Sequence, residues 1–322
     1  MSLSQWQWET ATAGAVAGFA TVAAMYPLDI VRTRFQGPPF LLSPFLSVYA
    51  YHQFPAYKNT AHAIFTITRL EGLKGLYAGF LPAVLGSTVS WGLYFFFYGR
   101  AKQRYSKNRE EKLSSGHHLA SAAEAGALVS LCTNPIWLIK TRLQLQNPLH
   151  QSRRYSGIYV LLFILHALRT ILREEGWTAL YKGLGPGLLM VSHGAIQFTA
   201  YEELRRIMVD YKEKKQKSEG ASNLLNSFDY ALLGGSSKIA AILITYPFQV
   251  IRTRAQQRPS KEGIPRYMNS WHVVKETARF EGIRGFYKGI TPNLLKNVPA
   301  SSITFIVYEN VLKLLRPKRR ND

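Results

Sequence analysis

The chain is poor in cysteine and in acidic residues. Its 322 residues include one cysteine, Cys132, and 19 aspartates and glutamates against 40 lysines and arginines, for a formal net charge of +21. A single cysteine excludes a disulfide framework and a cysteine-based zinc site within one chain. The basic excess indicates an anionic partner, and nucleic acid, lipid headgroups and a negatively charged small molecule each fit that description.

Common sequence motifs of enzymes and of secreted proteins are absent as well. There is no G-x-x-x-x-G-K-[S/T] loop, G-x-G-x-x-G turn, H-E-x-x-H motif or nucleophile elbow, so the sequence offers no support for nucleotide-driven, hydride or hydrolytic chemistry. The first residues, MSLSQWQWE, lack the features of a cleavable signal or transit peptide. We therefore expect no enzymatic activity, no metal and no cofactor.

What the sequence does contain is one pattern written three times. The motif P-x-[D/W/Q]-x-x-[R/K]-T-R-x-Q begins at Pro27, Pro135 and Pro247, and each copy is followed by E-G-x-x-x-[L/F]-Y-x-G. Two linked motifs that recur in the same order predict three copies of one structural unit. We place these repeats at residues 1–112, 113–222 and 223–322.

Each repeat contains two apolar segments long enough to cross a bilayer, which takes about 20 helical residues. The six segments are 10–35, 79–103, 117–145, 183–207, 228–255 and 289–314. They carry ionisable residues such as Glu124, Lys238 and Lys296, which spanning helices usually turn towards a bundle interior or a water-filled cavity. The sequence thus predicts an all-α membrane protein with six transmembrane helices around a central polar cavity, as in a pore or carrier.

The repeated motifs resemble the signature of the mitochondrial carrier family, P-x-[D/E]-x-x-[K/R]-x-[K/R] followed by [D/E]-G-x-x-x-x-[aromatic]-[K/R]-G, over essentially the whole chain. The resemblance implies six tilted helices in three pseudo-symmetric repeats, with both termini on the outer side and short helices along the inner side. PIWLIKTRLQLQ, SHGAIQFTAYEELR and TYPFQVIRTRAQQR further resemble the subgroup that carries folate, flavin or pyridine nucleotides.

The resemblance also implies an inner gate, in which the third residue of each proline motif pairs with the base of another repeat. The expected pairs are Asp29 with Lys140, Trp137 with Arg252, and Gln249 with Arg32. Only the first is ionic, while the second would be a cation–π contact and the third a charge-assisted hydrogen bond. Three glutamines at the ends of the motifs are expected to brace the closed gate: Gln36, Gln144 and Gln256.

An outer gate is implied by the family motif [F/Y]-[D/E]-x-x-[K/R] on the even-numbered segments. The residues that match it are Tyr98, Lys102, Tyr201, Glu202, Arg205, Tyr308 and Glu309. The family's pairing order leaves one ion pair, Glu309 with Lys102, because Gly99 and Leu312 occupy other charged positions. With one ionic pair at each end, neither state is expected to be trapped, since alternating access needs gates of comparable strength.

Substrate contacts in the family lie on the even-numbered segments, about three turns before the tyrosine of the outer motif. The residues expected to contact substrate, including the lysine that replaces a glycine of the other repeats, are Ser87, Ser90, Trp91, Met190, His193, Lys238, Lys296 and Asn297. Trp91 offers a flat face to a fused heterocycle, and Lys238 and Lys296 suit a carboxylate or phosphate. Structural roles stay open for Trp91 facing lipid, for His193 in packing and for Glu124 paired with Lys238.

These observations predict a transporter that moves folate or a related pterin across an organelle inner membrane by alternating access. FAD or a pyridine nucleotide such as NAD is the alternative cargo, and a carrier-like adaptor that no longer transports is the alternative from another class. A nucleic-acid-binding protein is disfavoured because the basic residues cluster at the ends of apolar spans. We expect a monomer in contact with membrane lipid, in the chloroplast envelope or the mitochondrial inner membrane.

Overall fold

The computed structural model describes residues 3–37, 57–106, 115–145, 160–216, 227–257 and 267–315, and every regular element within them is helical. The long helices are α1 (Leu3–Gln36), α4 (Phe80–Ser106), α5 (Ser115–Gln144), α8 (His193–Gln216), α9 (Ser227–Ala255) and α11 (Ile290–Leu315). The shorter helices are α3 (Thr60–Glu71), α6 (Val160–Glu175), α7 (Leu184–Leu189) and α10 (Ser270–Gly285). Three 3₁₀ turns complete the set: η1 (Leu73–Tyr77), η3 (Trp177–Tyr181) and η4 (Met190–Ser192). The expected repeat boundaries, after residues 112 and 222, lie outside the described residues.

Four of the helical spans are by themselves long and apolar enough to cross a membrane: Thr12–Gln36, Leu73–Tyr105, Gly116–Gln144 and Phe228–Ala255. The fourth expected segment, 183–207, is not one continuous α-helix. α7 ends at Leu189, η4 inserts a 3₁₀ turn, and α8 begins at His193. The turn packs on α5, where a Cβ added to Gly126 would lie 2.9 Å from Cγ1 of Val191, so the glycine makes room for the valine.

Two contacts hold the Y-x-G turn in every repeat: a side-chain hydrogen bond to its middle residue and a close approach of its glycine to the next repeat. The residue before each motif proline donates a side-chain hydrogen bond to the carbonyl at the middle position of that turn. These bonds join Tyr26 to Ala78 at 3.1 Å, Asn134 to Lys182 at 3.4 Å and Tyr246 to Lys288 at 3.0 Å. The glycine that follows packs on the next repeat; Gly289 has a φ of 81°, and a Cβ there would lie 2.8 Å from the carbonyl oxygen of Arg32.

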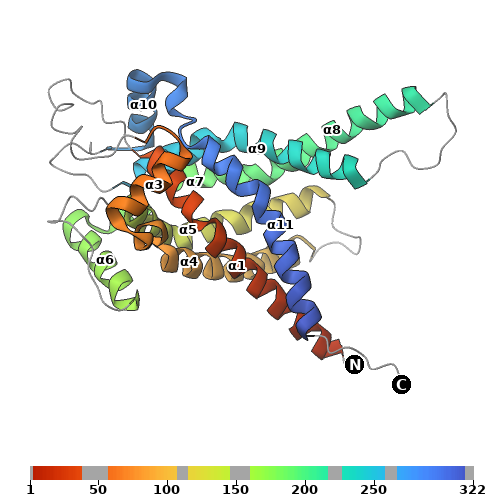
Figure 1. Ribbon diagram of the computed structural model, residues 1–322, viewed down its shortest axis with the longest axis horizontal. Coiled ribbons are helices and arrows are strands. Elements are labelled where there is room, and N and C mark those ends of the chain that lie inside the picture. Colours follow the sequence, from red (N-terminus) through yellow and green to blue (C-terminus); the bar gives the residue numbers. More distant parts are fainter. Residues whose placement is uncertain are drawn as a thin grey trace.

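The long helices pack as neighbours that come from different repeats: α4 with α5, α8 with α9, and α11 with α1. Figure 1 shows these pairs converging towards the end of the bundle that carries α3, α6 and α10, and diverging towards the end where both termini lie. We call these the proline end and the terminal end. A proline inside each of α1, α5 and α9 removes one helical hydrogen bond and favours a bend there.

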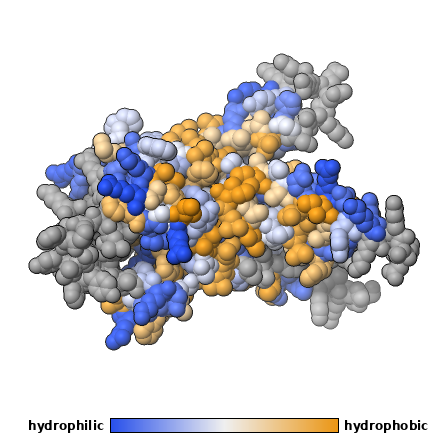
Figure 2. Space-filling view, turned by 90° about the horizontal axis from the view of Figure 1, so that it is seen from above, coloured by the Kyte–Doolittle hydropathy of each residue, from blue (hydrophilic) through white to orange (hydrophobic). Residues whose placement is uncertain are grey.

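The surface of the bundle has the character expected of a membrane protein. Large apolar side chains are exposed along the long helices, including Phe19, Phe95, Phe198 and Ile306. Figure 2 shows hydrophobic residues gathered over the middle of one face, with hydrophilic residues towards its two sides. Such a band has no counterpart on a typical monomeric soluble protein, where apolar patches are small.

Candidate functional site

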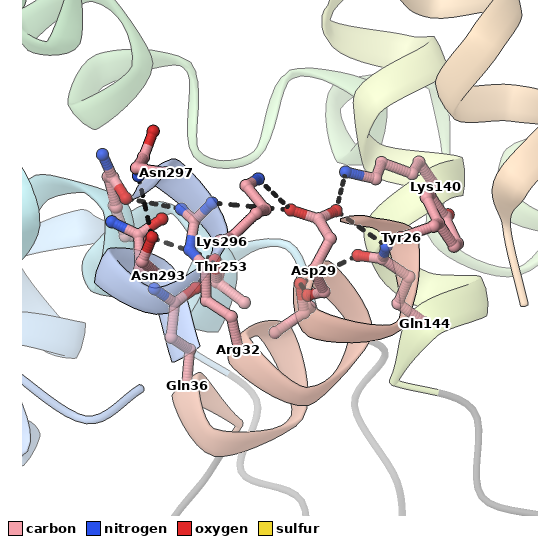
Figure 3. A network of polar contacts seen from close by, with 12 residues as sticks. Tyr26, Asp29, Arg32, Gln36, Lys140, Gln144, Thr253, Asn293, Lys296 and Asn297 are labelled. Carbon is pink, nitrogen blue, oxygen red and sulfur yellow. Dashed lines mark hydrogen bonds and ion pairs between the residues drawn. The ribbon is translucent and has the colours of Figure 1, made fainter. Parts of the chain in front are cut away.

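The three proline motifs meet in one network of polar side chains at the ends of α1, α5 and α9 (Figure 3). We call it the proline network; its members are Asp29, Arg32, Thr33, Gln36, Lys140, Thr141, Gln144, Gln249, Arg252, Thr253 and Gln256. The periodicity of a helix explains the grouping, because residues three and four positions apart share one face.

Asp29 is the charged centre of the network and is buried. Its Oδ2 accepts a hydrogen bond from Lys140 Nζ at 2.6 Å and another from Gln144 Nε2 at 3.1 Å. Its Oδ1 accepts one from Lys296 Nζ of α11 at 2.8 Å, and a guanidinium nitrogen of Arg32 lies 3.7 Å from the same oxygen. One carboxylate therefore compensates three cations, which come from three helices.

Threonine–glutamine hydrogen bonds close the network into a ring. The three bonds join Thr33 to Gln144, Thr141 to Gln256 and Thr253 to Gln36, each at 2.9 Å. They link α1 to α5, α5 to α9 and α9 to α1, so the glutamines expected as braces each contact a neighbouring repeat. The three contacts are equivalent, which reflects the pseudo-threefold arrangement of the repeats.

Two of the three proline motifs lack an acid at the position of Asp29, and the hydrogen bonds of the brace glutamines differ accordingly. Gln144 Nε2 donates to Asp29 and to the hydroxyl of Tyr26, whereas among the described residues the Nε2 of Gln256 has no hydrogen-bond partner and Gln36 has only the hydroxyl of Tyr246 beside it. By symmetry the acceptors of these two amides would be acids at the positions of Trp137 and Gln249. A buried donor left without an acceptor typically costs about 1–3 kcal/mol.

The structure brings together two of the three expected inner pairs. Lys140 contacts Asp29, and Arg32 donates a hydrogen bond to Oε1 of Gln249. The third pair is not formed. The nearest acceptor recorded for Arg252 is Oδ1 of Asn134, at 3.5 Å, while the indole of Trp137 has another neighbour.

That neighbour is Lys140, whose Nζ lies 5.3 Å from the centroid of the Trp137 ring. The indole ring and the side chain of Ile136 pack beside Gly86 of α4. A Cβ at Gly86 would approach the indole carbons to 3.7 Å and the side chain of Ile136 to 3.1 Å. Trp137 therefore packs against a glycine of another helix, a neighbour that the motif itself does not show.

Buried arginine–glutamate pairs hold each repeat together beside the network, and the sequence analysis assigned no role to their glutamates. The pairs are Arg34 with Glu71, Arg142 with Glu175 and Arg254 with Glu281. The Nε of each arginine also donates to the backbone carbonyl of a brace glutamine in another repeat. The signal was present in the sequence, since the glutamate of every E-G motif recurs at one place in each repeat.

Glu175, at the end of α6, is the member of these pairs that lies outside the spanning helices and has a perturbed acidity. Burial would raise the pKa of its carboxyl, but hydrogen bonds and positive charge from Arg142 and Lys182 outweigh that cost and lower the pKa. Glu175 is therefore ionised in the folded protein and depends on these two cations.

At the terminal end the expected gate residues stand apart. Lys102, Glu202 and Arg205 are exposed, and no ion pair joins Lys102 to Glu309 in the part of the chain that the structure describes. Tyr201, Tyr308 and Glu309 are half-buried. Tyr98 is held by a 3.0 Å hydrogen bond between its hydroxyl and Nδ1 of His118 in α5.

Within the described residues, the ion pairs at this end join helices that already pack as neighbours. Lys212 of α8 pairs with Asp229 of α9. Arg104 of α4 pairs with Glu124 of α5 at 2.6 Å, so the structure places the partner of Glu124 on α4 and does not pair it with Lys238.

The expected substrate contacts have varied surroundings. Ser87, Ser90, Met190, Lys238 and Asn297 are half-buried, and the amide of Asn297 bonds within its own helix to the carbonyl of Asn293. Lys238 on α9 lies near enough to His193 to act on it electrostatically.

The two ring systems among the expected contacts differ in how they are held. Trp91 is 60% exposed and stacks on Phe95, with ring centroids 5.8 Å apart. His193 Nδ1 shares a 2.9 Å hydrogen bond with the hydroxyl of Thr245 in α9, so this imidazole has a packing partner in the structure.

Comparison with known proteins then decides the family. The family model for the mitochondrial carrier protein matches three consecutive stretches, residues 4–109, 111–212 and 223–319. The chain belongs to the mitochondrial carrier family. It therefore has the all-α membrane fold of these carriers, with six transmembrane helices in three pseudo-symmetric repeats.

Individual mitochondrial carriers resemble the chain over most of its length. Folate transporter 1, chloroplastic, of Arabidopsis thaliana is 72% identical over 97% of both chains. Nicotinamide adenine dinucleotide transporter 1, chloroplastic, of the same plant is 35% identical over 95% of this chain and 91% of its own. The mitochondrial nicotinamide adenine dinucleotide transporter 1 of Saccharomyces cerevisiae is 34% identical, covering 93% of this chain and 75% of its own.

Proposed function

We propose that the chain is a carrier that moves folate, or a related pterin, across an organelle inner membrane by alternating access. The observation that carries the proposal is the 72% identity with the Arabidopsis folate transporter over 97% of both chains. The chloroplastic location in the name of that relative supports the chloroplast envelope as the membrane. We propose further that the chain works as a monomer surrounded by lipid and catalyses no reaction.

The charge of the proline end supports an anionic cargo. Arg32, Lys140, Arg252 and Lys296 gather there around Asp29, the one carboxylate of the proline network. An excess of positive charge within a low-dielectric bundle attracts anions and raises their local concentration. The carboxylates of the glutamate in folate are such anions, and so are the phosphates of NAD and FAD.

We propose that the proline network is the inner gate and that the structure corresponds to its closed state. The bundle then accepts cargo from the terminal end, where the helix pairs diverge (Figure 1). In the opposite state Lys102 and Glu309 would approach each other and close that end. Cargo would be held between the two gates, and the candidate contacts on α4, η4, α8 and α9 are the residues proposed to line that space.

NAD is the second candidate cargo, because two of the relatives at 34–35% identity are named as NAD transporters. FAD shares the same chemistry, a fused heterocycle joined to anionic groups. Trp91 suits the rings of all three compounds, so the aromatic contact does not discriminate among them.

Reconstitution of the purified protein in liposomes tests the proposal. Uptake of labelled folate that resists an excess of unlabelled FAD and NAD is the expected result. Competition by NAD or FAD with little folate uptake would overturn the choice of cargo. A folded protein that takes up none of the three would favour the adaptor function instead.

A further inference from the structure

Asp29 divides its two carboxylate oxygens between ammonium groups from two different helices. Lys140 of α5 donates to Oδ2 at 2.6 Å, and Lys296 of α11 donates to Oδ1 at 2.8 Å. Figure 3 shows the two lysines approaching Asp29 from opposite sides. Neither lysine displaces the other, so Asp29 has one partner more than a simple ion pair requires.

The two lysines differ in how their helices relate to α1. α1 and α11 pack along much of their length, and the hydroxyls of Thr21 and Thr304 lie 2.8 Å apart more than one turn away from Asp29. α1 and α5 contact each other far less, and the side-chain hydrogen bonds that join them in the described residues lie at the proline end. Opening that end would separate Asp29 from Lys140 and leave Lys296 beside it.

Lys140 also has a second partner, and it lies on its own helix. The indole face of Trp137, three residues earlier in α5, is 5.3 Å from the Lys140 ammonium. A cation over an indole is stabilised by the ring electrons without a counter-charge. Both members of the ionic gate pair therefore keep a neighbour that does not belong to the opposing helix.

We propose that Lys296 is the spare partner of Asp29, which keeps the carboxylate paired when the inner gate opens and Lys140 withdraws. Trp137 stabilises the Lys140 ammonium in the same way once Lys140 has left Asp29. Breaking a buried ion pair is costly because it leaves uncompensated charge, and a gate with only one ionic pair would otherwise concentrate that cost on Asp29 and Lys140. The inference rests on the proposed carrier cycle, and it makes Lys296 a positioning residue of the gate in place of a substrate contact.

In the observed state Arg32 is a weaker partner of Asp29 than Lys296 is. It is three residues from Asp29 on α1, but the distance of 3.7 Å is longer than a hydrogen bond, and its guanidinium donates to Gln249. The closer partner of Oδ1 is Lys296, at 2.8 Å.

Lys296→Met, made alone and together with Asp29→Asn, tests the role in the liposome assay. With Asp29 present, the loss of the ammonium should slow the maximal uptake rate by about tenfold and leave KM within about twofold, because only the step that opens the gate is affected. In the Asp29→Asn background the same change should have little further effect, since no carboxylate is then left for Lys296 to pair with. Lys296→Arg should keep most of the rate, and Lys275→Met, at an exposed position on α10, is the matched control.

A rise in KM of equal size in both backgrounds would overturn the proposal, because it would show that Lys296 binds cargo directly. The thermal unfolding midpoint in detergent gives a second reading that needs no cargo. Lys296→Met should lower the midpoint with Asp29 present and not in the Asp29→Asn background, and equal losses in both would overturn the pairing. Failure of folate uptake by the unaltered protein bears on the proposed function alone, because the midpoints would still report on the pair.

Discussion

The two ends of the bundle are held by different kinds of contact. At the proline end, α1, α5 and α9 from all three repeats are joined in one ring, whereas at the terminal end the recorded contacts stay within pairs of neighbouring helices. The ring nevertheless contains a single ion pair between these three helices, Asp29 with Lys140, and its other links are hydrogen bonds to neutral amides. The three helices at the proline end are therefore joined mainly by hydrogen bonds, and by charge at one place only.

Charge is instead concentrated inside the repeats. The arginine–glutamate pairs that tie each odd helix to its E-G turn are buried and ionic, while the contacts between repeats are mostly neutral. Strong bonds within a unit and weaker bonds between units allow each repeat to move as one body. A carrier that must separate its repeats in every cycle gains from that division.

The largest effect should come from breaking a pair inside a repeat. Arg34→Met removes the bidentate partner of Glu71, and Ala78 stands in this repeat where Lys182 and Lys288 support the equivalent glutamates. A largely buried carboxylate without a partner should cost up to about 3–5 kcal/mol of stability. The thermal unfolding midpoint in detergent measures the loss.

Arg104→Met is the matched control at the terminal end. Its side chain is 65% exposed in the pair with Glu124, and exposed pairs contribute at most about 1 kcal/mol. Equal losses from the two substitutions would contradict the difference between the two ends.

A charge reversal tests whether the terminal end closes through the expected pair. Lys102→Glu should reduce uptake by about tenfold or more, because two carboxylates would then face each other in the closed outer gate. Adding Glu309→Lys should restore much of the rate. No recovery in the double variant, with the protein inserted and folded, would remove this pair from the outer gate.

Restoring a lost acid should strengthen the closed proline end. In Gln249→Glu the hydrogen bond from Arg32 becomes an ion pair, and the buried Nε2 of Gln36 gains an anionic acceptor. We expect a higher unfolding midpoint and uptake slowed by about threefold to tenfold, since the closed state gains about 1 kcal/mol or slightly more. Uptake at the unaltered rate would show that the inner gate does not limit transport.

The smallest effect should appear as a pH dependence at Glu175. Its folded pKa is lowered, so its contribution to stability is present above the unfolded pKa, about 4.3, and is lost as the pH falls through the folded value. The difference in unfolding midpoint between the unaltered protein and Glu175→Gln should thus be constant near neutral pH and shrink in acid. A difference that grows as the pH falls would show that the direction of the pKa shift is wrong.

Much of the site could be predicted because its positions recur. The repeated motifs located Asp29, Lys140 and the brace glutamines, and the structure places all of them in one ring. The family match bears out the carrier fold. The roles of these residues as gates and of the even-helix residues as substrate contacts stay predictions, to be decided by the experiments above.

What the sequence did not show is which side chains become partners across helices. Trp137 contacts Lys140 and packs beside Gly86 of α4. Lys296 bonds to Asp29 because α11 runs beside α1, although the two residues are 267 positions apart in the chain. Neither contact can be inferred from the local sequence pattern.

The sequence by itself determined the three repeats, the six spans and the residues offered at each gate position, since periodic motifs and apolar length are local properties of a chain. Only the tertiary structure decided at which end the helix pairs converge and how one carboxylate is shared among three cations. The physical reason is that hydrogen bonds and ion pairs act over a few ångströms, and those distances are set by the packing of helices from different repeats.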